Sequence, residues 1–297
     1  MKRVCLLLTS LLLVGCNWNH NSVKIIMPNG TPQLGLVNFI SDHLEDCEVV
    51  EGQQPLAAAF SNKKYDIIVA PVNLGAKNYN VDKSYGLYET FVWGNLYLVS
   101  TKEITSFTDL DGKEITLFGQ NTTPDIIMKL LINHYDIDIE MKYVNAVSDA
   151  NTALKQGRAD IIVSAEPSLS KIKQGYHVLD LQDEYSKAMS VSSYPQAGIF
   201  VKLNSIDKLK DTLLEMKTSI NDIIENPSDG AKNAIQVSTT FATLGEETIN
   251  ASIPNCHFGF DKNQKEAIET YFTKLNELNL QGMYGGQLPD EEFYITF

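Results

Sequence analysis

The chain has 297 residues, of which 43% are hydrophobic and 21% are charged, a composition typical of an ordinary globular protein. Its length suits about two domains with a substantial buried core. The formal net charge of −13 argues against a nucleic-acid partner, which would require a stripe of basic side chains.

The amino terminus has the pattern of an export signal. Lys2 and Arg3 precede an apolar stretch of 11 residues, 4–14, which ends before Gly15 and Cys16. This stretch is too short to span a bilayer as a helix but suits the hydrophobic region of a signal peptide. Residues 13–16, LVGC, resemble the bacterial lipobox, in which the signal is cleaved before the Cys and the thiol is lipidated. The alternatives are an ordinary cleaved signal with a chance Cys and an uncleaved core helix.

The sequence therefore predicts a signal peptide over residues 1–15, lipidation (palmitate) at Cys16 and a polar tether over 16–22. Two or three acyl chains would hold the protein stably on a membrane, because each buried methylene contributes about 0.8 kcal/mol. Loss of Lys2 and Arg3 leaves 22 basic against 37 acidic residues, a net charge of −15. We expect the body to be anchored by lipid on the extracytoplasmic face of a bacterial cell membrane.

The body begins with a unit that the chain repeats. Residues 23–27 are predicted as a strand, residues 28–32 as a polar elbow, and the spacing of the apolar residues over 34–44 indicates a helix. A short helix over 55–60 then precedes a buried strand at 66–69.

The second unit follows the same order. A strand at 115–118 runs through Gly119 into the polar elbow 120–123, and a helix is expected from Pro124 to Leu131. A helix over 149–156 then precedes a strand at 160–163. In both elbows a Thr, Thr31 or Thr123, precedes a Pro, so we expect the Thr to be the N-cap and the Pro the first helical residue.

Matched spacing indicates two α/β lobes built on one plan. The elbow Pro and the Asp of the following Asp-Ile-Ile-Val strand are 34 residues apart in the first unit, Pro32 to Asp66, and 36 in the second, Pro124 to Asp160. Two single apolar strands can resemble one another by chance. Chance does not explain strands, elbows and helices that match in order and also in spacing.

Two strands are expected to cross between the lobes, one over 93–100 and one over 194–201. The helices expected over 206–224, 231–236 and 262–278 would then cover the first lobe. We predict two Rossmann-like α/β lobes joined by two crossing hinge strands, with a ligand cleft between them. Lobe 1 comprises residues 23–98 and 199–297, and lobe 2 comprises residues 99–198.

Several motifs between residues 65 and 294, among them WGNLYLV at 93–99 and YPQAG at 194–198, carry a resemblance to a known family. From residue 23 onward the chain resembles the type II periplasmic solute-binding proteins of ABC importers, in the nitrate/sulfonate/taurine branch. The motif FTDLDGKEI is shared widely in that group, whereas WGNLYLV and YPQAG are more specific to a lipoprotein subgroup. The motifs that carry the resemblance are YDIIVAPVNL at 65–74, WGNLYLV at 93–99, FTDLDGKEI at 107–115, QGRADI at 156–161, YPQAG at 194–198 and GGQLPDEEFY at 285–294.

The resemblance implies a type II binding-protein fold and a transport role. A small-molecule solute would be captured between the lobes, which close on it and deliver it to a membrane permease with its ATPase. Such a protein needs no cofactor and is expected to act as a monomer and not as an enzyme.

The ligand crevice of an open α/β sheet lies at the carboxyl ends of its strands. Four elbows are expected to meet there, at residues 29–31, 70–73, 120–123 and 166–168. Helix starts offer free backbone N–H groups to a polar ligand, and hydroxyl and amide side chains both donate and accept. The predicted ligand contacts in the elbows are Asn29, Thr31, Asn73, Asn121, Thr122, Thr123 and Glu166, with helix capping as the alternative for the two residues Thr31 and Thr123.

The hinge strands add aromatic and amide candidates. The rings of Trp93 and Tyr194 are expected to stack on a bound heterocycle, or else to pack in the hinge core. Gln196 is expected to add an amide contact.

The charges near the elbows favour a neutral or cationic solute, such as a nitrogen heterocycle or an amine. Arg158 is the only Arg after the signal and lies at a turn away from the elbows, and none of the four elbows contains a Lys. Arg clamps are the common way to bind carboxylate, phosphate and sulfonate groups. A sulfonate is the second choice, because helix N-termini alone can bind an oxyanion.

Histidine and cysteine usage does not predict a metal centre. The five His residues are scattered without metal-ligand spacing. Cys47 and Cys256 form either a disulfide or two small buried hydrophobic sites, which sequence cannot decide.

Two other functions remain as alternatives. An enzyme on the same fold would need a nucleophile or an acid–base pair in the cleft, and Glu166 is the only titratable elbow residue. A sensory ligand-binding ectodomain would need a membrane partner, and no transmembrane segment follows the body.

Overall fold

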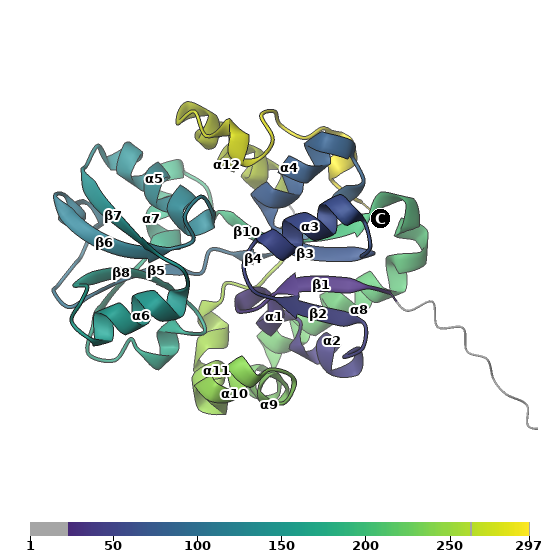
Figure 1. Cartoon of the computed structure of the whole chain (residues 1–297), viewed down its shortest axis with the longest axis horizontal. Helices are drawn as coiled ribbons and strands as arrows, with labels where there is room; N and C mark the ends of the chain where they lie inside the picture. Colours follow the sequence, from purple (N-terminus) through teal and green to yellow (C-terminus); the bar gives the residue numbers. More distant parts are fainter. Residues whose placement is uncertain (1–22, 262, 297) are drawn as a thin grey trace, which may run out of the picture.

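The structure, a computed structural model, describes residues 23–261 and 263–296. The predicted signal peptide, Cys16 and the tether lie outside the described residues. Each of the two lobes is built around a five-stranded sheet (Figure 1), which confirms the predicted two-lobed α/β fold. No helix in the described part of the chain is long and apolar enough to cross a membrane.

The two sheets repeat one strand order. The first sheet has the order β2-β1-β3-β10-β4 and the second has the order β7-β6-β8-β5-β9. In each sheet three parallel strands of one lobe are followed by an antiparallel strand that begins at a crossing, β10 or β5. The strands are β1 Ile25–Pro28, β2 Cys47–Val50, β3 Ile67–Pro71, β4 Tyr85–Trp93, β5 Leu96–Ser100, β6 Lys113–Phe118, β7 Ile139–Val144, β8 Ile161–Ala165, β9 His177–Asp180 and β10 Pro195–Lys202.

Helices cover both faces of each sheet, so the central strands are buried on both sides. In the first lobe α3 and α4 cover one face and α2 and α8 the other. In the second lobe α5 and α7 cover one face and α6 the other. The helices are α1 Thr31–Gly35, α2 Val37–Asp42, α3 Gln54–Asn62, α4 Val72–Asp82, α5 Thr123–Tyr135, α6 Val147–Lys155, α7 Leu181–Met189, α8 Ile206–Glu225, α9 Pro227–Val237, α10 Thr239–Leu244, α11 Glu246–Ser252 and α12 Gln264–Glu277.

Short 3₁₀ helices connect several of these elements. One of them, η2, follows the elbow after β8, and another, η4, follows α11. The 3₁₀ helices are η1 Phe107–Leu110, η2 Leu169–Lys171, η3 Leu203–Ser205, η4 Ile253–Asn255, η5 Gln281–Met283 and η6 Glu291–Phe293.

The helix expected over residues 34–44 is divided into α1 and α2. Leu36, with φ −114° and ψ 13°, breaks the helix between them. Leu44 lies beyond the end of α2 and is 58% exposed. The helical spacing of apolar residues in the sequence therefore extends beyond the residue at which the helix ends.

The Thr capping prediction was wrong in both elbows. Thr31 and Thr123 are the first residues of α1 and α5, and the N-cap positions belong to Gly30 and Thr122. Gly30 has no side chain to cap α1, and the Thr122 side chain makes no capping bond to α5. Instead, the Thr122 hydroxyl donates back to the Gly119 carbonyl oxygen at 2.6 Å.

The carboxy-terminal helices cover the first lobe, as expected, but two of them also reach the second. α8 packs its apolar face on the first sheet, whereas α11 packs against η2 and α12 packs against both β10 and α5. Because η2 and α5 belong to the second lobe, these helices join the lobes on two sides (Figure 1).

The strand expected over residues 93–100 is interrupted between the lobes. Gly94 and Asn95 have φ values of 94° and 92°, which end β4 and start β5 in the other sheet. Gln182 ties the two crossings together, because its Nε2 donates to the Trp93 carbonyl oxygen at 2.7 Å and to the Ser193 hydroxyl. The chain therefore changes sheet at 94–95 and before β10, a few residues from the predicted lobe limits at 98/99 and 198/199.

We expect Gly94→Ala to lower the free energy of unfolding by about 2–4 kcal/mol, because it combines a strained positive φ with overpacking. A Cβ atom at this position would lie 2.7 Å from Cδ of Gln182. The measurement is urea unfolding of the full-length chain followed by circular dichroism.

The matched control is Gly112→Ala, which has φ 67° but open space at the Cβ position. Its expected cost is only about 1–2 kcal/mol. Equal losses of unfolding free energy in the two variants would show that the contact of the new Cβ atom with Gln182 does not destabilise the fold.

Candidate functional site

The elbow after β1 of the first lobe meets the elbow after β8 of the second lobe. The Thr31 hydroxyl, at the start of α1, donates to the Glu166 carbonyl oxygen at 2.7 Å. Asn95 accepts the Glu166 N–H at 2.9 Å and donates to its carbonyl oxygen at 3.3 Å and to the Thr31 hydroxyl. All three residues are at most 4% exposed. The elbow of each lobe and the first crossing therefore form one buried polar contact.

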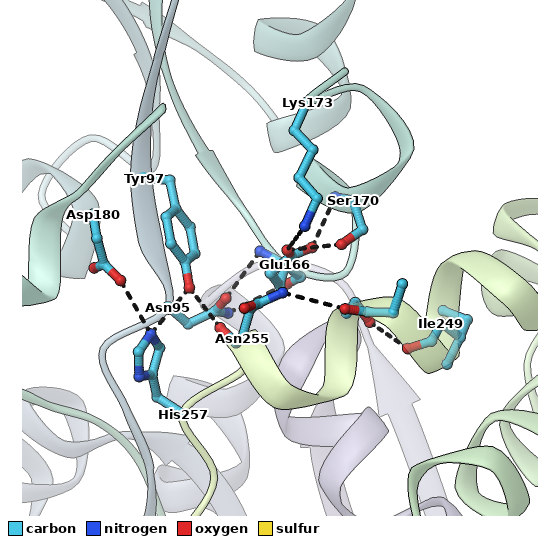
Figure 2. A network of polar contacts seen from close by, with 11 residues as sticks. Asn95, Tyr97, Glu166, Ser170, Lys173, Asp180, Ile249, Asn255 and His257 are labelled. Atoms are coloured by element: carbon cyan, nitrogen blue, oxygen red, sulfur yellow. Dashed lines mark hydrogen bonds and ion pairs between the residues drawn. The ribbon is translucent and has the colours of Figure 1, made fainter. Parts of the chain in front are cut away.

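The Glu166 carboxylate faces its own loop. It accepts the Ser170 N–H and the Ser170 hydroxyl, both at 2.8 Å, and the Lys173 ammonium lies 3.9 Å away (Figure 2). Burial raises the pKa of Glu166, and its bonds to Ser170, the charge of Lys173 and a bond from Asn255 oppose that rise. The carboxylate is thus already surrounded by donors from the protein.

A second polar chain joins the carboxy-terminal segment to the second lobe (Figure 2). The Tyr97 hydroxyl, from β5, donates to the Asn255 carbonyl oxygen at 2.7 Å and lies 3.0 Å from Nε2 of His257. The same Nε2 is 3.4 Å from Oδ2 of Asp180, at the end of β9. Burial raises the pKa of Tyr97. An imidazole, a carboxylate and a phenol therefore lie beside the elbow contact.

Trp93 and Tyr194 are buried at the crossings. Trp93 is 7% exposed and donates from Nε1 to the Thr90 carbonyl oxygen at 3.2 Å. Tyr194 is fully buried, with its ring edge-on to that of Tyr185 at 5.2 Å. Their roles as ligand-stacking rings stay predictions beside this hinge packing. Gln196 is half-buried, and its Oε1 has no hydrogen-bond partner within the described residues.

The side-chain amides of Asn29 and Asn73, in the first-lobe elbows, bond to other residues of the first lobe. Asn29 donates to the Glu51 carboxylate at 3.3 Å, and buried Asn73 donates to the Met283 carbonyl oxygen at 3.2 Å. These contacts anchor a loop and the carboxy-terminal segment, so ligand contact by Asn29 and Asn73 stays a prediction.

The second-lobe elbow is organised by Asp125, which sequence reasoning missed. This fully buried carboxylate, in the first turn of α5, accepts the Asn121 N–H at 2.8 Å, the Tyr143 hydroxyl at 2.8 Å and the Lys129 ammonium at 2.8 Å. Asn121 itself is exposed, with φ 60°. A protein carboxylate therefore already occupies the positive end of the α5 dipole, beside Thr122 and buried Thr123.

Asn95, Asn255 and His257 were also missed. The sequence could have indicated Asn95, because a Gly-Asn pair inside an expected strand favours a turn. Asn255 and His257 come from a segment with no repeat partner, so only the packing of α11 against η2 could place them beside Glu166.

The described residues contain neither a cluster that could hold a metal ion nor a disulfide. No group of three or more His, Cys, Asp or Glu side chains there could hold a metal ion. Cys47 and Cys256 are both free thiols. Cys256 is fully buried in the cluster that α1 and α2 form with α9–α11.

Residues 37–277 match the model of a protein family described as "Menaquinone biosynthesis". The chain belongs to this family. No curated protein sequence matches this family member significantly.

Solved structures share the fold of this family member. An ABC transporter protein from Parabacteroides distasonis is 19% identical, with 92% of this chain and 98% of that chain covered and a TM-score of 0.76. The periplasmic aliphatic sulphonate-binding protein of Escherichia coli is 12% identical, with coverage of 90% and 93% and a TM-score of 0.64. A zinc-bound ligand-binding component of an ABC-type import system from Staphylococcus aureus is 13% identical, with coverage of 92% and 96% and a TM-score of 0.65. At these identities the likeness establishes the type II binding-protein fold.

We expect the stability that Glu166 provides, relative to Glu166→Gln, to fall as the pH rises. Burial raises the pKa of Glu166 in the folded chain, so the folded state holds its proton more tightly than the unfolded state does. This contribution is fully present below the unfolded pKa of about 4.3 and is lost as the pH rises through the folded pKa. Urea unfolding of both proteins from pH 3.5 to 8 measures the difference.

Ser170→Ala provides the control. It removes one hydrogen bond that lowers the pKa of Glu166. The stability that Glu166 provides should therefore persist to higher pH before it is lost. A stability difference independent of pH would contradict the raised pKa.

Proposed function

We propose that this protein is the solute-binding component of an ABC importer, capturing a small organic molecule between its lobes and delivering it to a membrane permease with its ATPase. One observation carries the proposal: an elbow of one lobe meets an elbow of the other directly, through Thr31 after β1 and Glu166 after β8. A site made of two half-sites, one on each lobe, opens and closes as the lobes move about their crossings. The fold, shared with a protein described as an ABC transporter and with one described as a ligand-binding component of an ABC-type import system, supports this role.

The contacts between the lobes suit reversible closure. The polar contacts are single hydrogen bonds and ion pairs, such as Thr31 to Glu166 and Lys171 to the Leu244 carbonyl oxygen at 3.1 Å, and they accompany the packing of α11 and α12 against the second lobe. A net contribution of about 0.5–1.5 kcal/mol for each bond is small enough for thermal opening. We propose that the solute adds the remaining stabilisation of the closed form, which the permease then recognises.

The proposed solute is neutral or cationic, with a nitrogen heterocycle or an amine as the best examples. Asp125 already occupies the N-terminus of α5, so this helix offers little to an oxyanion. Arg158 is exposed and bonds to Gln156 at 2.8 Å, on the turn between α6 and β8. A sulfonate is therefore the second choice, although the sulphonate-binding protein has this fold.

A second candidate function is an enzyme on the same fold. The family description, Menaquinone biosynthesis, favours it, and so does the His257–Asp180 pair beside Glu166. Such a site could move a proton on a small molecule. The same side chains also bridge protein segments to one another, which favours binding as the first candidate.

We expect the full-length chain, purified in detergent, to carry one small molecule that heat releases chemically unchanged. Native mass spectrometry and analysis of the released compound test this. In a thermal-shift panel, nitrogen heterocycles or amines should raise the Tm, because they match the charges around the elbows. Stabilisation only by ethanesulfonate or nitrate would contradict the proposed solute class, and chemical conversion of the compound would favour the enzyme.

We also propose that lipid on Cys16 anchors the protein, which would keep it beside the permease at the membrane. In the native host, Cys16→Ser should move most of the protein from the membrane pellet to the soluble fraction, because two or three acyl chains are lost. The matched control is Cys5→Ser, within the predicted signal, which should leave the protein in the membrane pellet. Equal membrane retention of both variants would contradict the anchor.

A further inference from the structure

Three tyrosine hydroxyls are buried without partners. Tyr185 in α7, Tyr194 just before β10 and Tyr271 in α12 are each fully buried, and their hydroxyls have no hydrogen-bond partner within the described residues. A buried Tyr normally bonds through its hydroxyl, because an unsatisfied buried polar group costs about 1–3 kcal/mol. Three such groups call for an explanation.

The three tyrosines lie together where the lobes join. The rings of Tyr185 and Tyr194 are edge-on, with centroids 5.2 Å apart. Burial raises the pKa of all three. Asp180 and Tyr97, and to a smaller extent Tyr271, raise the pKa of Tyr194 further, and Tyr185 raises that of Tyr271. The Leu96 N–H lowers the pKa of Tyr194 without reaching the geometry of a hydrogen bond. The three rings thus belong to one part of the core, and each hydroxyl lacks a hydrogen-bond partner within the described residues.

The elements that carry these residues belong to both sides of the molecule. α7 covers the second sheet, Tyr194 is on the second crossing, and α12 packs against β10 of the first sheet and α5 of the second lobe. All three rings are part of one apolar cluster that spans the lobes. The three tyrosines are therefore contributed by the second lobe, the second crossing and the carboxy-terminal helix α12.

We propose that Tyr185, Tyr194 and Tyr271 donate hydrogen bonds to a carbonyl oxygen of the captured solute, and that this solute is neutral. The inference rests on the proposed function and narrows its solute class. Unpartnered phenol protons among apolar side chains are complementary to an acceptor oxygen, which a protonated amine does not offer.

The surrounding charges favour a neutral carbonyl over an anion. The Asp180 carboxylate acts on the Tyr194 hydroxyl and raises its pKa, so the potential there is negative. Lys187, two residues after Tyr185 in α7, is 2.7 Å from the Glu184 carboxylate and is thereby neutralised. An anionic group would therefore meet repulsion that the neutralised Lys187 does not offset.

The test uses Tyr185→Phe, Tyr194→Phe and Tyr271→Phe in the full-length chain, with uracil, hydantoin and 2-pyridone as neutral carbonyl probes. Ethanesulfonate and benzylamine represent the anionic and cationic classes. We expect a neutral probe to bind, and each variant to bind it about 3- to 10-fold more weakly, as measured by calorimetry. The Tm of the unliganded variants should stay equal or rise, because each loses an unsatisfied polar group.

Tyr294→Phe is the matched control. Its hydroxyl is also buried without a partner in the described residues, but it lies beside Leu87 of β4, in the first lobe. We expect it to leave the Kd of the probe unchanged.

Each other outcome overturns a distinct part of the inference. Unchanged affinity in the three variants, or a lower Tm without ligand, would remove the hydroxyls from the site. Binding of only ethanesulfonate or benzylamine, or of no probe, would overturn the neutral carbonyl class. The proposed function fails separately, if native mass spectrometry finds no retained small molecule.

Discussion

Asn95 joins the two lobes through the backbone of Glu166. Its side-chain amide accepts the Glu166 N–H and donates to the Glu166 carbonyl oxygen, and Thr31 donates to that same oxygen. These groups are buried, so each bond must form within the protein or leave a costly unsatisfied polar group. The relative position of the lobes, the direction of the Glu166 carboxylate and the contact of Asn255 with it all follow from this constraint.

The internal repeat places elbows of both lobes at corresponding edges of their sheets, and the contact joins two elbows that are not repeat equivalents. Each lobe has the same strand order, so equivalent elbows lie at the same edge of their sheets. When the lobes face each other, the first-lobe elbow after β1 meets the second-lobe elbow after β8. The crossing strands then complete each sheet with an antiparallel strand, which couples the lobe interface to both cores. A solute that bridges the elbows would therefore act on the whole molecule.

Local patterns predicted the elements of the repeat well, because short β-branched strands and Pro-initiated helices carry their own signals. Predicted helix and strand positions agree with α8, α9, β3 and β8. The patterns failed where tertiary contacts override local preference. Thr31 does not cap α1, because its hydroxyl bonds to the other lobe, and the strand over residues 93–100 is broken at Gly94 and Asn95. The candidate site was predicted as a set of elbows, whereas the groups that meet Glu166 from η4 and its own loop were not.

The sequence by itself determined that the chain forms two α/β lobes of one plan, because order and spacing of strands, elbows and helices are local properties that repeat along it. It also determined the charge balance that argues against nucleic acid. Only the tertiary structure decided which polar groups meet, because contacts such as Glu166 with Thr31 join residues 135 positions apart in the chain. It alone brings Tyr185, Tyr194 and Tyr271 into one apolar cluster, since they belong to three separate elements whose packing no local pattern encodes.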